Sequence, residues 1–139
     1  MSLDRRYNQS KHAERRRITR ARNKDQMRRI RVRMLREGRT TCHLCDRPIR
    51  LDVDQYDPEA FTLDHLDPVS MSDARWTKYE DVAPAHRRCN TARGTKSVEA
   101  TRLELRGLAG VELPPPGEYV KLPDGGFLNS EGFVNSRPW

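Results

Sequence analysis

Cys42-His43-Leu44-Cys45 and His86-Arg87-Arg88-Cys89 are the two segments that decide the fold. Each segment carries two metal-ligand side chains separated by two residues, and this spacing lets both side chains of a pair face one ion. Two such pairs complete a tetrahedral site, and thiolate and imidazole ligands with no open position are typical of structural Zn²⁺. The sequence therefore predicts one zinc ion held by Cys42, Cys45, His86 and Cys89.

Two alternatives exist for these ligands. His43 could replace a cysteine within the first segment, although the spacing favours Cys42 and Cys45. The cysteines could also be ordinary buried thiols, which small proteins contain. All three cysteines of the chain, however, fall in the two segments. An odd number of cysteines, without the apolar stretch of a secretory signal, also argues against a disulfide framework.

The composition is consistent with a fold that depends on a metal. The 139 residues fit one small domain with an appended arm. Only 35% of the residues are hydrophobic, against 34% charged, which is too little apolar material for a large core. A structural zinc ion contributes on the order of 10 kcal/mol to the folding of such domains and would offset this deficit. No apolar run approaches the roughly 18 residues of a membrane span.

The net charge of +7 is unevenly distributed along the chain. Residues 1–41 hold 15 Lys and Arg against 4 Asp and Glu, a net charge of +11, whereas residues 42–139 hold 12 against 16, a net charge of −4. Within the basic part, residues 24–37 contain neither Gly nor Pro and repeat apolar residues at helical spacing, which predicts a helix. A solvated, disordered tail is the alternative for residues 1–20. A basic arm of this kind typically binds nucleic acid, and its candidate phosphate contacts are Arg15, Arg16, Arg17 and Arg20.

A candidate hydrolytic pair, Asp64-His65, lies in the predicted strand 60–66, which Asp67-Pro68 ends. Asn90 directly follows the last zinc ligand, so zinc binding would fix its position. Carboxylate and amide oxygens suit a hard divalent cation, and a neutral imidazole beside that ion could deprotonate a water molecule for attack on a phosphodiester. Alone, the pair is a weak signal, because a single strand histidine is more often structural. Alternation along a regular strand also directs adjacent side chains to opposite faces.

The order and spacing of these pieces resemble the HNH endonucleases, and most closely the small zinc-stapled members from bacteriophages and homing elements. The resemblance covers residues 40–105 and rests on Cys42-x2-Cys45, Leu63 to Pro68, and Asp81 to Asn90, with Arg93-Gly94 and Lys96 after them. It implies a small α+β fold with a ββα-metal (His-Me finger) nuclease core, stapled by a structural zinc and preceded by the basic helical arm.

The resemblance also implies roles for individual residues. His65 matches the general base, and Asp64 and Asn90 match the ligands of a catalytic Mg²⁺ or Mn²⁺. His86 stands at a zinc-ligand position where Cys is more common. Asp81 stands where the family has an Asn that braces the loop between the strands; an Asp accepts hydrogen bonds but cannot donate them. Contacts with DNA phosphates are expected from Arg87, Arg88, Arg93 and Lys96.

These features divide the chain into three predicted parts. Residues 1–39 form a basic, largely helical DNA-binding arm, and residues 40–110 form the zinc-stapled nuclease domain. Within that domain, residues 87–106 are predicted to be helical, with Gly94 as a weak point. Residues 111–139 form a Pro- and Gly-containing tail in which Asp124-Gly125-Gly126 would turn a small hairpin.

The predicted function is metal-dependent cleavage of double-stranded DNA, by nicking or by cutting both strands. The resemblance suggests a gene of a bacteriophage or mobile element and a site of action in the bacterial cytoplasm. One alternative is a zinc-stapled nucleic-acid-binding protein without cleavage activity, which the Asp at position 81 favours. Another is a nuclease accessory to phage packaging proteins. The sequence leaves open whether the chain is a monomer or a dimer.

Overall fold

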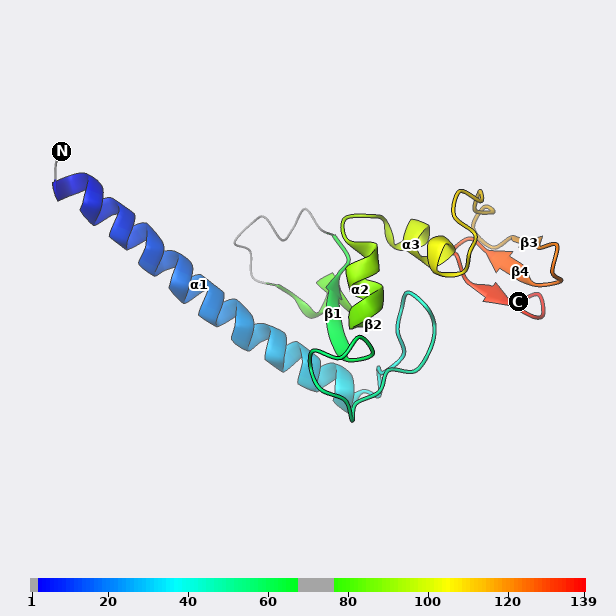
Figure 1. Ribbon diagram of the computed structural model, residues 1–139, viewed down its shortest axis with the longest axis horizontal. Coiled ribbons are helices and arrows are strands. Elements are labelled where there is room, and N and C mark those ends of the chain that lie inside the picture. Colours follow the sequence, from blue (N-terminus) through cyan, green and yellow to red (C-terminus); the bar gives the residue numbers. More distant parts are fainter. Residues whose placement is uncertain (1–2, 68–76) are drawn as a thin grey trace. The chain divides into compact units, whose positions relative to one another are not determined.

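The computed structural model describes residues 3–67 and 77–139, and it describes the backbone alone for residues 3–9, 19 and 20. The order of elements is α1, β1, η2, β2, α2, α3, β3, β4 and β5 (Figure 1). The chain divides into two compact units, Met1–Arg39 with His65–Val82, and Thr40–Asp64 with Ala83–Trp139. Pro68, the last residue of the expected strand motif, lies outside the described residues.

Helix α1 runs from Leu3 to Arg36 and begins the first unit (Figure 1). It ends in a Schellman motif: Gly38 has φ +70°, its N–H donates to the Leu35 carbonyl, and the Arg39 N–H donates to the Met34 carbonyl at 2.9 Å. Of the predicted apolar stripe, Ile30 and Met34 are buried. Among the described residues, no helix is both long and apolar enough to cross a membrane.

Tyr79 connects the short 3-10 helix η2 (Tyr79–Asp81) to the end of α1 within the first unit. Its hydroxyl donates to Glu37 and accepts from Arg39 Nη1 at 3.0 Å. The Arg33 guanidinium lies 3.8 Å above the centre of its ring, a cation–π contact. These contacts explain why a polar segment between two strands folds back on a basic helix.

Strands β1 (Phe61–His65) and β2 (Val82–His86) form a two-stranded sheet. The pairing is antiparallel, because the Arg87 N–H donates to the Ala60 carbonyl beyond one end and the Leu66 N–H donates to the Asp81 carbonyl beyond the other. Every residue of β2 is buried. Helix α2 (Arg87–Arg93) follows β2 without a connecting loop.

The helical prediction for residues 87–106 is wrong at its centre, where the structure has two helices instead of one. Helix α2 ends at Gly94, whose φ of +54° lies in the left-handed region that glycine tolerates best. Helix α3 (Val98–Leu105) then begins with Ser97 as its N-cap, and the Ser97 hydroxyl accepts from the Ala100 N–H at 3.1 Å. The break directs the second helix away from the axis of the first.

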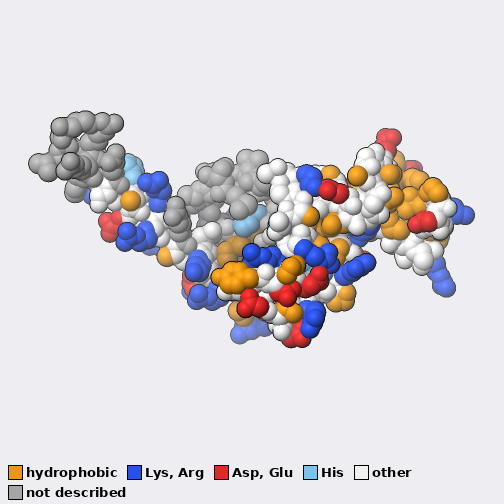
Figure 2. Space-filling view, in the orientation of Figure 1, with side chains coloured by type: hydrophobic (Ala, Val, Ile, Leu, Met, Phe, Trp, Pro, Cys, Tyr) orange, Lys and Arg blue, Asp and Glu red, His pale blue; other side chains and the backbone are white. Residues whose placement is uncertain are grey.

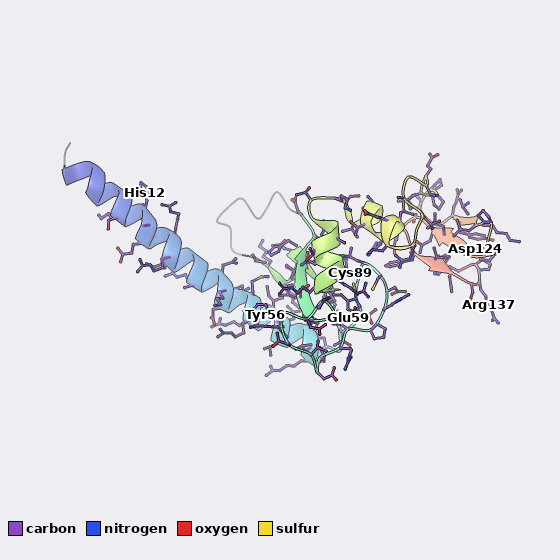
Figure 3. The ribbon with its side chains drawn as sticks, in the orientation of Figure 1. His12, Tyr56, Glu59, Cys89, Asp124 and Arg137 are labelled. Carbon is purple, nitrogen blue, oxygen red and sulfur yellow. The ribbon has the colours of Figure 1, made fainter. Side chains whose placement is uncertain are left out.

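The C-terminal residues form a small antiparallel sheet in the order β3-β4-β5. Strands β3 (Tyr119–Lys121) and β4 (Phe127–Asn129) are joined by a turn containing Asp124, whose side chain accepts from the Gly126 N–H (Figure 3). Strand β5 (Val134–Asn135) completes the sheet. Leu128 and Leu122 form a hydrophobic cluster with Leu103 of α3. The C-terminal residues therefore belong to the packed core of the second unit.

We expect Leu128→Ala to lower the free energy of unfolding by about 2–5 kcal/mol, because it leaves a cavity at a fully buried position. Chemical denaturation monitored by circular dichroism measures this change. Val120→Ala is the matched control: Val120 pairs with Leu128 across the sheet but is 43% exposed, so its effect should stay within about 0.5 kcal/mol. Equal effects of the two substitutions would contradict the assignment of Leu128 to the core.

Candidate metal centre and hydrolytic site

The first metal-ligand segment forms a tight knuckle in the second unit. An isolated bridge between Thr41 and Pro48 closes its base. Inside the bridge, the Cys42 N–H donates to the Arg47 carbonyl and the Asp46 N–H donates to the Cys42 carbonyl, both at 2.9 Å. Asp46 has φ +62°, a left-handed conformation that Asp and Asn tolerate better than most residues. This reversal turns both cysteines toward one point.

The four predicted zinc ligands come together. The ligand atoms of Cys42, Cys45, His86 and Cys89 all lie within 4.8 Å of one another. His86 Nδ1 lies 3.3 Å from Cys45 Sγ and 3.8 Å from Cys89 Sγ. His86 ends β2 and Cys89 lies in the first turn of α2 (Figure 3). The cluster could hold a structural metal such as zinc.

The surroundings of the cluster also suit a bound cation. His86 Nε2 lies 3.0 Å from the Pro48 carbonyl, which can only accept, so the proton resides on Nε2 and Nδ1 presents its lone pair to the sulfurs. Arg88 Nη1 donates to Cys89 Sγ at 3.5 Å. This arrangement fixes the imidazole in its ligating tautomer.

The thiols need a nearby cation to ionise. Burial, reinforced by the negative charges of Cys42 and Cys45, raises the pKa of Cys89 to about 12. Burial likewise raises the pKa of Cys45. Thiolates at such positions form only when a metal ion compensates their charge. The donor set, its spacing and its burial therefore fit Zn²⁺.

A second polar centre surrounds Asp64, which is 4% exposed. Its Oδ2 accepts from His43 Nε2 at 2.7 Å and from Arg93 Nη1 at 2.7 Å. Both contacts fall on the same oxygen, so neither involves Oδ1. Arg93 is 2% exposed, and its buried guanidinium does not fit the expected contact with DNA phosphates. The carboxylate of β1 binds this arginine internally instead.

Asn90 lies against the face of β1 that carries Asp64. Its Nδ2 donates to Thr62 Oγ1 at 3.5 Å. Thr62 precedes Asp64 by two residues, and side chains two apart share one face of a strand. Arg93, three residues after Asn90 and so on the same side of α2, contacts Asp64 itself. The Asn90 side-chain oxygen and Asp64 Oδ1 are oxygen donors of the kind that suits Mg²⁺ or Mn²⁺.

A comparison with known families finds a similarity in this part of the chain. Residues 42–96 match the family model of the HNH endonucleases. This segment is thus similar to an HNH domain. The match begins at the first metal-ligating cysteine and includes the Asp64-His65 pair, Asn90 and α2. No curated protein and no solved structure matches the chain.

Two further HNH positions, His65 and Asp81, lie in the first unit. His65 is the last residue of β1 and is half-buried. Asp81 Oδ2 accepts from the Lys78 N–H at 2.9 Å, and the Asp81 N–H donates to the Lys78 carbonyl at 3.0 Å. The side chain of Asp81 thus closes the turn that leads into β2, and this contact requires only an acceptor.

The basic residues of the HNH domain differ in their accessibility. Arg87 is exposed, and its Nη1 donates to the Gln55 carbonyl at 3.3 Å. Arg88 pairs with Glu59, and Lys96 pairs with Glu104. Such solvent-exposed pairs contribute about 0–1 kcal/mol, so a phosphate could replace the carboxylate at little cost. On α1, Arg15, Arg16 and Arg17 are exposed, whereas the side chain of Arg20 lies outside the described residues.

The sequence did not indicate that His43 and Arg93 both contact Asp64. Because His43 lies between two cysteines, its only expected role was that of a substitute ligand. Because Arg93 lies in a basic segment, it was expected to contact DNA phosphates. Their partner, Asp64, is 21 residues from His43 and 29 residues from Arg93. A weak signal existed: a buried carboxylate requires partners, and both residues belong to segments that carry the predicted zinc ligands.

We expect one zinc ion per chain, and we expect His86→Ala to lose it. Because structural zinc contributes on the order of 10 kcal/mol, the melting temperature should fall by at least about 10 °C. Metal content by mass spectrometry and thermal melting measure the two effects. His12→Ala, at an exposed position on α1, should change neither. A metal-free chain that melts no earlier than the zinc-loaded chain would refute the structural role.

Proposed function

We propose that the chain is a metal-dependent DNA endonuclease whose β1, β2 and α2 form a ββα-metal core. In this proposal, Cys42, Cys45, His86 and Cys89 hold a structural zinc ion. Asp64 and Asn90 hold the catalytic Mg²⁺ or Mn²⁺, and His65 is the general base. The observation that carries the proposal is the placement of Asn90 against the Asp64 face of β1, inside a segment that matches the HNH family.

The proposed reaction is hydrolysis of a phosphodiester. The neutral imidazole of His65 accepts a proton from a water molecule as its oxygen attacks phosphorus, and the bond to the leaving oxygen breaks. Asp64 and Asn90 would hold the divalent ion through their side-chain oxygens. The bound ion supplies Lewis-acid stabilisation of the charge that develops on the phosphate and the leaving oxygen. Arg87 and Arg88 bind flanking phosphates.

Asp81 supports an active site of this type in spite of its departure from the family pattern. The bracing contact that this position makes is a hydrogen bond from the Lys78 N–H, and an aspartate accepts it as well as an asparagine would. The backbone of Asp81 supplies the other bonds of the turn. The extra negative charge is therefore compatible with the loop.

The N-terminal arm is the proposed source of DNA affinity. Lys and Arg side chains lie along α1 (Figure 2), and residues 1–41 have a net charge of +11 against −4 for the remainder. Each phosphate neutralised by such a side chain releases condensed counterions, which makes binding strongly dependent on salt. Phosphate contacts position the protein without reading sequence. The arm would thus hold duplex DNA of any sequence.

We expect the zinc-loaded chain to nick supercoiled plasmid in the presence of Mg²⁺ or Mn²⁺. His65→Ala should reduce the rate by about 10²–10⁴-fold, because a general base contributes that much. His12→Ala should leave the rate unchanged. A gel assay of plasmid relaxation measures all three proteins.

The outcomes of this assay separate the candidate functions. A wild-type chain that binds DNA but never nicks it with either metal would be a zinc-stapled binding protein. Nicking that requires added phage packaging proteins would make the chain an accessory nuclease of that machine. Equal rates for wild type and His65→Ala would refute the assignment of the base.

We expect the triple variant Arg15→Ala, Arg16→Ala, Arg17→Ala to bind duplex DNA more weakly and with a flatter salt dependence. The slope of log K against log salt concentration should decrease by about 0.9 for each phosphate contact removed. Fluorescence anisotropy over a salt series measures the slope. Arg50→Ala is the control, since Arg50 is exposed but pairs with Asp52 outside the arm. An unchanged slope in the triple variant would contradict the role of the arm.

A further inference from the structure

His43 is the residue inside the metal knuckle whose contacts the proposed function does not explain. Its N–H donates to the Pro84 carbonyl at 2.9 Å, and its carbonyl accepts from Arg102 Nε at 2.8 Å. The flanking Cys42 belongs to the metal cluster. The backbone of His43 is therefore fixed by β2, by α3 and by the cluster.

The side chain of His43 is 12% exposed and contacts the proposed catalytic carboxylate directly. Its Nε2 lies 2.7 Å from Asp64 Oδ2. Because a carboxylate only accepts, Nε2 carries the proton and donates it to this bond. The bond joins the structural metal cluster to the hydrolytic site through a single residue.

Arg93 is a second donor to the oxygen of Asp64 that His43 contacts. Its Nη1 donates to the same Oδ2 at 2.7 Å, and its Nε donates to the Lys96 carbonyl at 2.9 Å. A guanidinium beside a carboxylate favours a bidentate pair that uses both oxygens. With His43 also on Oδ2, the two donors share one oxygen. Oδ1 of Asp64 then stays available to a cation.

We propose that His43 is a positioning residue that holds Asp64 so that Oδ1 binds the catalytic divalent cation. The proposal rests on the proposed function, in which Asp64 is a ligand of that ion. Without His43, the carboxylate loses the donor that holds its orientation, and the ion loses a preorganised ligand. The role requires a donor at the position of Nε2 and does not require an imidazole.

The test compares Mn²⁺ binding by zinc-loaded, full-length His43→Gln and His43→Asn variants with the wild-type chain. The Gln amide nitrogen can reach Asp64, whereas the Asn amide is shorter by one methylene group and cannot. The electron paramagnetic resonance signal of free Mn²⁺ measures binding without any cleavage. We expect about 10–100-fold weaker binding for His43→Asn and near wild-type binding for His43→Gln. Zinc content and melting temperature should be similar in both variants.

Plasmid nicking is measured in parallel, so that failure of this proposal is distinct from failure of the proposed function. The nicking rate of His43→Asn should approach the wild-type rate at high Mn²⁺ concentration, because the defect lies in ion binding. Unchanged Mn²⁺ affinity in His43→Asn overturns the positioning role even if the chain nicks DNA. Equal losses in both variants, or absence of Mn²⁺ binding in the wild type, also overturn it. Binding that depends on His43 in a chain without nicking activity supports the positioning role and refutes the nuclease.

Discussion

The convergence of four metal-ligating side chains constrains almost everything else in the second unit. Cys42 and Cys45 come from one knuckle, and His86 and Cys89 come from the junction of β2 and α2. The chain has too little apolar material for a large core, and a structural metal would contribute on the order of 10 kcal/mol, which is comparable to the whole stability of a small domain. Once the junction is fixed, the start of α2 is fixed with it.

Helix α2 connects the metal cluster to the side chains of β1. Its first two N–H groups lack partners within the helix, and they donate to the Ala60 and Pro58 carbonyls just before β1. Cys89 belongs to the metal cluster, while Asn90 and Arg93 contact side chains of β1. A helix of seven residues is too short to be stable alone. It persists because every turn of it is attached either to the cluster or to the strand.

The sequence predicts those features that depend on local spacing. The two metal-ligand pairs follow from their Cys-x2-Cys and His-x2-Cys spacing. The interest of Asp64-His65 and Asn90 follows from the resemblance to HNH nucleases, whose family model matches residues 42–96. The break at Gly94 was not predicted, because one glycine costs a helix only about 1 kcal/mol and the N-cap at Ser97 is needed to make the break favourable. The contacts of Asp64 were not predicted, since they require the relative placement of a knuckle, a strand and a helix.

The arginines show why charge alone does not identify a DNA-binding residue. Arg102 Nε and Nη1 donate to the carbonyls of His43 and Glu131, and Arg106 Nη1 donates to the Leu44 carbonyl. Burial lowers the pKa of both guanidinium groups, yet arginine remains charged at neutral pH and continues to donate.

The Phe133 ring, after the turn between β4 and β5, lies 4.2 Å from the Arg102 guanidinium and 5.0 Å from that of Arg106. Because Arg102 also binds the carbonyl of His43, a continuous set of contacts runs from the C-terminal sheet through α3 and the knuckle to Asp64. A buried or half-buried arginine in this domain therefore orients backbone and carboxylate groups, whereas Arg15, Arg16 and Arg17 of α1 are exposed. The net charge of +7 therefore includes arginines in both environments, and burial distinguishes them.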